Sequence, residues 1–115
     1  MYDDETKYTV KEIIEFCHEC PIEIIDREKT RQFLYKCGKT QDEIKDEIRS
    51  LREEHACSEP ELDYNPNHKG YVYQFKKVVF GMYWCYIKIK MKINNGKLVA
   101  ILSFHEEEYK TYEKH

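Results

Sequence analysis

The sequence lacks a long apolar run, and residues that break secondary structure are scarce in it. No apolar segment approaches the roughly 20 residues that cross a bilayer as a helix, and there are only 4 glycines and 3 prolines. The first residues, Met1 to Glu5, are acidic, and no apolar core follows them. A secretory signal needs a basic start and an apolar core. These absences lead us to expect a cytoplasmic, globular protein.

The sequence also lacks an even set of cysteines. It has 5, and an odd number without an expected signal peptide indicates reduced thiols. Cys17 and Cys20 have the spacing of half a zinc site, but a second pair is missing, and Cys17 falls on the apolar stripe of a predicted helix. A thioredoxin-like redox motif should instead follow a strand. A zinc site stays an open alternative, and we expect no metal and no cofactor.

Acidic side chains are missing from one long segment. Residues 64–105 contain seven lysines and no Asp or Glu, whereas residues 1–63 carry 18 acidic and ten basic residues. The net charge of −3 therefore hides an acidic first half and a basic second half. Because a basic surface attracts a phosphate backbone, RNA is the partner that the second half is expected to meet.

The first part, residues 1–55, is predicted to be mainly helical. Two capping boxes, Thr9 with Glu12 and Thr40 with Glu43, mark the starts of two helices. Each helix has apolar side chains at helical spacing. These residues are Val10, Ile13, Ile14 and Cys17 in one helix, and Ile44, Ile48 and Leu51 in the other.

Three further segments complete the first part. A helix is predicted from Arg27 to about Cys37, with Gly38 in the left-handed position that ends a helix. The β-branched segment Ile22 to Ile25 is typical of a short strand. Residues 55–70, which contain Pro60, Pro66 and Gly70, are predicted to form a long loop of a kind that is often functional.

From Tyr71 the pattern changes to period two. Strands are predicted over residues 71–76, 83–93 and 97–105, with Gly81 in the first connection and Asn94-Asn95-Gly96 as a hairpin turn. The chain is thus expected to form one α+β domain over residues 1–115. Its N-terminal helices should pack on one face of an antiparallel sheet formed by residues 71–105.

Alternation assigns the side chains of these strands to two faces. One face is predicted to join the core and includes Ile87, Ile89, Met91, Ile93, Leu98, Ala100, Leu102 and Phe104. The other face would gather Gln74, Lys76, Tyr86, Lys88, Lys90, Ser103 and His105. Histidine transfers protons near pH 7, and lysines stabilise developing phosphate charge. This set suits RNA cleavage without Mg²⁺, for which no acidic cluster is present on the face.

Ordinary structural roles compete with this interpretation. A lysine-rich strand face can be a solvated face or an edge guarded against aggregation. A single histidine at the end of a strand is more often structural than catalytic. Aromatic residues in the strands are commonly core and rim rather than platforms for bases, and they include Tyr71, Tyr73, Phe75, Phe80, Tyr83 and Trp84.

Several segments, taken in order, resemble the MqsR family of bacterial type II toxins, which are RNA interferases on a RelE-like fold. They are Tyr8–Ile14, Gly38–Ile44 with its continuation to Leu51, Asp63-Tyr64 and Glu108-Tyr109. The sharpest part is Tyr86-Ile87-Lys88-Ile89-Lys90 followed by Leu102-Ser103-Phe104-His105. It is similar to the family's VYIKL…ISF(H/K) ending.

The resemblance implies a metal-independent endoribonuclease, an mRNA interferase that cleaves RNA by attack of the 2′-hydroxyl. It also implies a cognate antitoxin protein as a second partner. By position, the family's catalytic residues fall on Gln74, Tyr86 and His105, where some members have lysine at the last position. The family's loop lysine has no clear counterpart, although His55 and His68 are candidates. A non-catalytic module that binds RNA or the antitoxin is the alternative.

The face pattern completes the expected site. Lys76, Lys88, Lys90 and Ser103 are predicted to bind the RNA, because they share the face of the proposed catalytic residues. The choice between Tyr86 and His105 as general acid and general base stays open.

Overall fold

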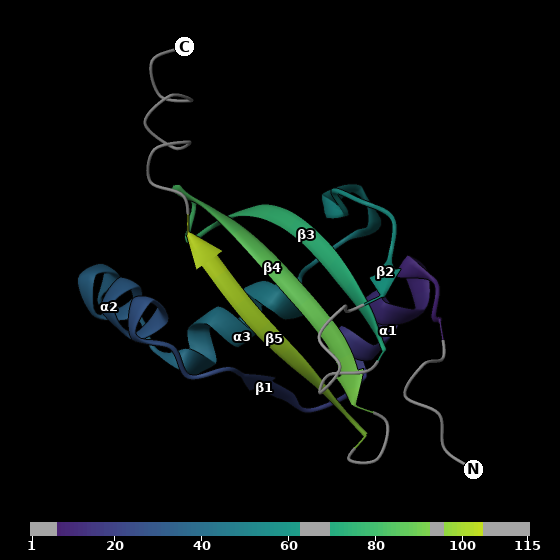
Figure 1. Ribbon diagram of the computed structural model, residues 1–115. Helices are drawn as coiled ribbons and strands as arrows, with labels where there is room; N and C mark the ends of the chain where they lie inside the picture. Colours follow the sequence, from purple (N-terminus) through teal and green to yellow (C-terminus); the bar gives the residue numbers. More distant parts are fainter. Residues whose placement is uncertain (1–6, 63–69, 93–95, 105–115) are drawn as a thin grey trace.

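A computed structural model of the chain describes residues 7–62, 70–92 and 96–104 (Figure 1). In this part of the chain, three α-helices pack with one five-stranded sheet, so the predicted α+β class is confirmed. The elements are, in order, α1 (Val10–Glu19), β1 (Ile22–Ile24), α2 (Glu28–Cys37), α3 (Gln41–Arg49), η1 (Glu53–His55), β2 (Glu61–Leu62), β3 (Tyr71–Val79), β4 (Tyr83–Lys92) and β5 (Lys97–Phe104).

The sheet has the order β1-β5-β4-β3-β2. Strands β3, β4 and β5 form the predicted antiparallel meander. The expectation of a wholly antiparallel sheet is wrong, because β1 pairs in parallel with β5 from Ile22 opposite Leu98 to Ile24 opposite Ala100. Strand β2 pairs with β3 from inside the segment predicted to be a loop. The period of a segment predicts a strand but not the strand with which it pairs, so neither pairing could be predicted from the sequence.

The helices begin where their capping residues predict. The side chain of Thr9 accepts a hydrogen bond from the Glu12 amide at 3.1 Å, and the Glu12 carboxylate accepts one from the Thr9 amide at 2.9 Å. Thr40 and Glu43 repeat this arrangement at the start of α3. Helix α2 ends at Gly38, whose φ of 68° is the left-handed conformation expected there. None of these helices is long and apolar enough to cross a membrane.

The core lies between the helices and one face of the sheet. Ile13 of α1 and Ile44 and Ile48 of α3 are fully buried, as are Ile87 and Ile89 of β4. The predicted core residues Leu98, Ala100 and Leu102 are also buried, and Met91 is partly buried against this cluster. Ile93 and the Phe104 side chain lie outside the described part of the structure.

The opposite face of β3, β4 and β5, which we call the open face, carries no helix among the described elements. Figure 1 is viewed from this side, so that α1 and α3 lie behind the sheet. The open face is not polar throughout, because Val99 of β5 is buried on it with 7% of its surface exposed. The fold thus separates one sheet face for the core from one face for other contacts.

The hairpin between β3 and β4 depends on an unusual residue. Strand β3 continues to Val79, beyond its predicted end, and the chain then turns through Phe80 and Gly81, whose φ values are 53° and 75°. A bulky residue with positive φ is strained. Phe80 is held there because its amide donates to the Glu47 carboxylate at 3.1 Å and its ring stacks on Phe33 at a centroid distance of 6.4 Å. These contacts hold the turn that joins the two long strands.

Candidate functional site

The register of the sheet brings most of the predicted site together on the open face. Lys76 lies directly opposite Tyr86, and Tyr86 lies opposite Ser103. In the next row of this face, Gln74 lies opposite Lys88. Because neighbouring strands are about 4.8 Å apart, each row places groups from different strands within reach of one nucleotide.

The remaining predicted site residues have different outcomes. Lys90 lies on the same face, one row beyond Lys88 and opposite Val99. His105 lies outside the described residues, as does His68, so their predicted roles stay predictions. The open face therefore holds six of the seven predicted site residues, and sequence alternation alone was enough to group them.

Lys76 is the centre of a cation–π cluster on this face. Its Nζ lies 4.8 Å from the centroid of the Trp84 ring and 5.2 Å from that of the Tyr86 ring. Trp84 lies opposite Val78, which makes it the diagonal neighbour of Lys76 across β3 and β4. All three side chains are half-buried. Trp84 is one of the strand aromatics for which a core or rim position is the commoner role, whereas alternation from Tyr86 places it on the open face.

The charge of the open face is strongly one-sided. Strands β3, β4 and β5 contain no Asp or Glu. Among the described residues, carboxylates at the margins include Glu23 of β1, which forms an ion pair of 2.5 Å with Lys97, and exposed Glu61 of β2, which lies opposite Val72. Lys76, Lys88 and Lys90 thus add positive charge to a face whose own strands supply no carboxylate, and positive charge on a surface attracts an anionic ligand.

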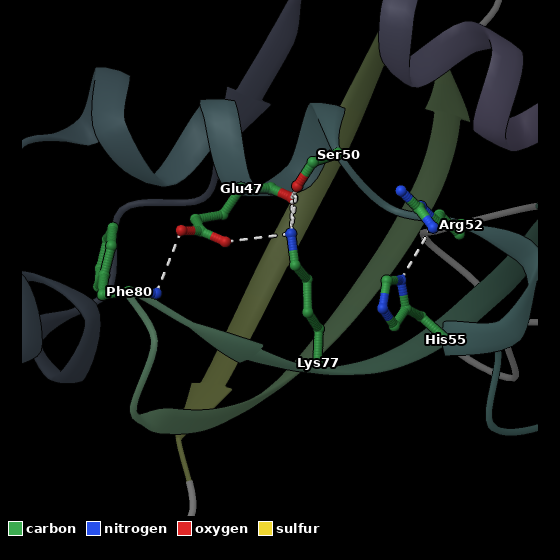
Figure 2. Close-up of polar contacts among 6 residues, drawn as sticks. All are labelled: Glu47, Ser50, Arg52, His55, Lys77 and Phe80. Atoms are coloured by element: carbon green, nitrogen blue, oxygen red, sulfur yellow. Dashed lines mark hydrogen bonds and ion pairs between the residues drawn. The ribbon is translucent and has the colours of Figure 1, made fainter.

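Lys77, the neighbour of Lys76, faces the helices and has a different role. Its Nζ lies 3.0 Å from a carboxylate oxygen of Glu47 and donates to the Glu47 carbonyl oxygen at 2.8 Å and to the Ser50 hydroxyl (Figure 2). The Lys77 and Glu47 side chains are only 12% and 24% exposed. This ion pair joins α3 to β3, so Lys77 belongs to the structural core and not to the candidate site.

His55, a candidate for the missing loop lysine, lies in η1 beside the outer edge of β3. The next residue, Ala56, bridges to Phe75, and the Cys57 amide donates to the Gln74 carbonyl oxygen at 3.0 Å. His55 Nδ1 accepts a hydrogen bond from the Arg52 amide at 2.9 Å (Figure 2). Burial, followed by the positive charge of Lys77, lowers the pKa of His55. This environment favours a neutral, structural imidazole and does not favour a substitute for a cationic lysine.

Metal ligands are not assembled in the described part of the chain, where no group of three or more His, Cys, Asp or Glu side chains could hold an ion. Cys17 is fully buried, and burial raises the pKa of its thiol to about 12. Arg49 donates to the carbonyl oxygens of Cys17 and Cys20 at 3.0 and 3.2 Å and thereby caps the end of α1. The contacts of this segment are thus those of a helix terminus packed on α3.

The chemistry available on the open face is therefore cationic, aromatic and hydrogen-bonding. The lysines supply positive charge, Tyr86 and Ser103 supply hydroxyl groups, and Gln74 supplies an amide. In comparisons with known proteins, no family model, no curated protein and no solved structure matches this chain.

Proposed function

We propose that this protein is a metal-independent endoribonuclease that acts as the toxin of a type II toxin–antitoxin system, on a RelE-like fold of the MqsR type. The observation that carries the proposal is the row Lys76–Tyr86–Ser103 beside the pair Gln74–Lys88 on the open face. Together with the sequence resemblance, this arrangement supports RNA cleavage better than a merely solvated sheet. The absence of carboxylates from β3 to β5 supports an anionic substrate.

The proposed reaction needs three contributions from the protein. The 2′-hydroxyl loses its proton and attacks the adjacent phosphorus, and the bond from phosphorus to the 5′-oxygen breaks as that oxygen gains a proton. The products are a 2′,3′-cyclic phosphate and a free 5′-hydroxyl. A base, an acid and positive charge next to the pentacovalent phosphate are sufficient for this chemistry.

The predicted residues can supply these contributions. Tyr86 and His105, the residue that follows β5 in the sequence, are the proposed proton-transfer pair. Lys76 is directly opposite Tyr86, so its ammonium group can stabilise a phosphate held at the Tyr86 hydroxyl. Gln74, in the adjacent row, can donate its side-chain amide to a phosphate oxygen. Ser103 and the lysines of β4 extend the contacts along the RNA backbone.

Purified protein and single-stranded RNA in the presence of EDTA provide the direct test. We expect cleavage that leaves 2′,3′-cyclic phosphate ends, and no cleavage at a position with a 2′-deoxy sugar. Tyr86→Phe and His105→Ala should each slow cleavage by about 10²-fold or more, the usual contribution of general acid–base catalysis. Tyr35→Phe is the matched control, because Tyr35 lies on α2 and is 90% exposed.

The alternative of a non-catalytic module predicts a different result. Protein that binds RNA but never cuts it, with a folded wild type and folded variants, would overturn the nuclease proposal in favour of this alternative. Dependence of cleavage on an added divalent ion would overturn the proposed chemistry.

The toxin proposal adds a partner, a cognate antitoxin protein that is commonly encoded next to the toxin. Co-expression with the product of a small adjacent gene should give a complex in which RNA cleavage is suppressed. Expression of the wild type alone should arrest growth of a bacterial host, whereas the Tyr86→Phe/His105→Ala double variant should be tolerated. Equal tolerance of both proteins would count against a toxin.

A further inference from the structure

The cation–π cluster of the open face has features that the proposed proton transfers do not use. Trp84 is the only tryptophan of the chain, and it lies on the same strand face as Tyr86, two residues away. We infer that Trp84, with Lys76, forms a subsite that stacks one unpaired base of single-stranded RNA next to the proposed cleavage position. This inference rests on the proposed function and names the form of RNA that the site accepts.

The geometry favours a base beside a phosphate. Residues two apart on a strand are separated by about 6.8 Å, so Trp84 and Tyr86 present two aromatic rings at successive steps along β4. The Lys76 ammonium lies between them, 4.8 and 5.2 Å from the two ring centroids. A nucleic-acid strand that places a base on one ring would bring its phosphate to the same ammonium group.

The charges and aromatic rings around Trp84 determine which ligand the subsite binds. Aromatic side chains that stack successive bases, next to cations that follow the backbone, are the usual means of binding single-stranded nucleic acid. Lys88 and Lys90 continue the positive charge along β4, and β3 to β5 carry no carboxylate. A duplex keeps its bases stacked inside the helix, where an indole ring cannot reach them. Unpaired RNA is therefore the ligand that uses both the charge and the rings.

The single tryptophan makes the subsite directly observable. The probe is a short 2′-O-methyl oligoribonucleotide, which cannot be cleaved by attack of its 2′-oxygen, with a dye at one end. We expect saturable quenching of Trp84 emission at the same concentrations that raise the anisotropy of the dye. Trp84→Leu should weaken binding by about tenfold, within the range found for base–aromatic stacking, and Trp84→Phe should weaken it less. Tyr35→Leu removes an exposed aromatic ring from α2 and should change nothing.

Two results would overturn the subsite. One is binding of the oligonucleotide without a change in Trp84 emission. The other is a folded Trp84→Leu variant that binds as tightly as the wild type. The same strand annealed to its complement should bind more weakly and leave the emission unchanged, and equal quenching by the duplex would contradict the selection of unpaired bases. If Trp84→Leu fails to fold, the wild-type emission and Trp84→Phe still decide the question.

The outcome is separable from that of the proposed function. Quenching and a tenfold loss in Trp84→Leu, together with no cleavage of unmodified RNA, would leave the subsite intact and overturn the nuclease. Cleavage of unmodified RNA by a wild type whose affinity is unaffected by Trp84→Leu would overturn the subsite and leave the nuclease intact.

Discussion

Two adjacent lysines of β3 can test whether one face of the sheet stabilises the fold while the other face binds RNA. Lys76 lies on the open face, and Lys77 lies against α3. We predict that Lys77→Met lowers the stability of the protein without changing its affinity for RNA. Lys76→Met should instead weaken RNA binding and leave the stability nearly unchanged. Methionine is used in both variants because it keeps most of the unbranched side chain and removes only the charge and its hydrogen bonds.

The cost of Lys77→Met follows from the contacts of the ion pair. The variant leaves the Glu47 carboxylate 24% exposed and without its partner at 3.0 Å. Removing one member of a fully buried pair costs about 3–5 kcal/mol, and an exposed pair contributes about 0–1 kcal/mol. This pair is partly buried, so Lys77→Met should lower the free energy of unfolding by about 2–3 kcal/mol, between these two limits. Such a loss lowers Tm by about 8–12 °C in a domain of this size.

The Lys76→Met variant should show the opposite pattern. Its cation–π contacts at 4.8 and 5.2 Å contribute about 1 kcal/mol or less at a partly exposed site, so Tm should change little. Loss of one phosphate contact to single-stranded RNA should lower the slope of log K against log salt by about 0.7. The slope is measured by anisotropy between about 50 and 200 mM salt, alongside thermal unfolding of the same samples.

Either of two results would refute this division of roles between Lys76 and Lys77. If Lys76→Met destabilises the protein as much as Lys77→Met, the open-face lysine is structural. If Lys77→Met loses RNA affinity while its Tm is unchanged, the ion pair with Glu47 is not what fixes Lys77. Either result would remove the physical basis for choosing Lys76 as the phosphate ligand.

Two further predictions concern stability. The pKa of His55 is lowered in the folded protein. At pH values just below the ordinary histidine pKa of about 6.5, the unfolded chain therefore binds more protons than the folded protein does. The free energy of unfolding should fall as the pH drops through this region. The His55→Asn variant keeps an acceptor for the Arg52 amide and should reduce the pH dependence of urea unfolding. If the pH dependence is unchanged in this variant, it arises from other groups. The Arg49→Met variant loses two charged hydrogen bonds to the end of α1, and its free energy of unfolding should be lower by about 2–3 kcal/mol. A urea midpoint equal to that of the wild type would show that solvent replaces these hydrogen bonds.

Local sequence signals predict where the helices and strands of this fold lie better than they predict which strands pair with one another. The capping boxes at Thr9 and Thr40 located two helix starts, because these hydrogen bonds join residues only three apart. The parallel pairing of β1 with β5 joins Ile22 to Leu98, and no local pattern records such a contact. The turn at Phe80 was equally hidden, because its positive φ depends on Glu47 and on packing against α2.

The candidate site was predictable to the extent that it depends on strand alternation. Period two was sufficient to group Tyr86, Lys88 and Ser103 on one face. The same rule also assigns Trp84 to that face, but its significance emerged only when the register placed Lys76 beside its ring. Lys77 shows the converse case. A lysine at a core-facing position has no explanation in the strand itself, because the carboxylate that neutralises it comes from α3.

The charge distribution of the sheet indicates that its open face has a role beyond folding. Helix α3 mixes Asp, Glu, Lys and Arg on its surface, as a solvated face does, whereas Lys88 and Lys90 repeat on one face of β4 with no acid on the adjoining strands. Neighbouring like charges repel in the folded state. Lys88→Gln should therefore leave the stability unchanged or raise it slightly while weakening RNA binding. A loss of stability with RNA affinity intact would instead show that Lys88 serves only the fold.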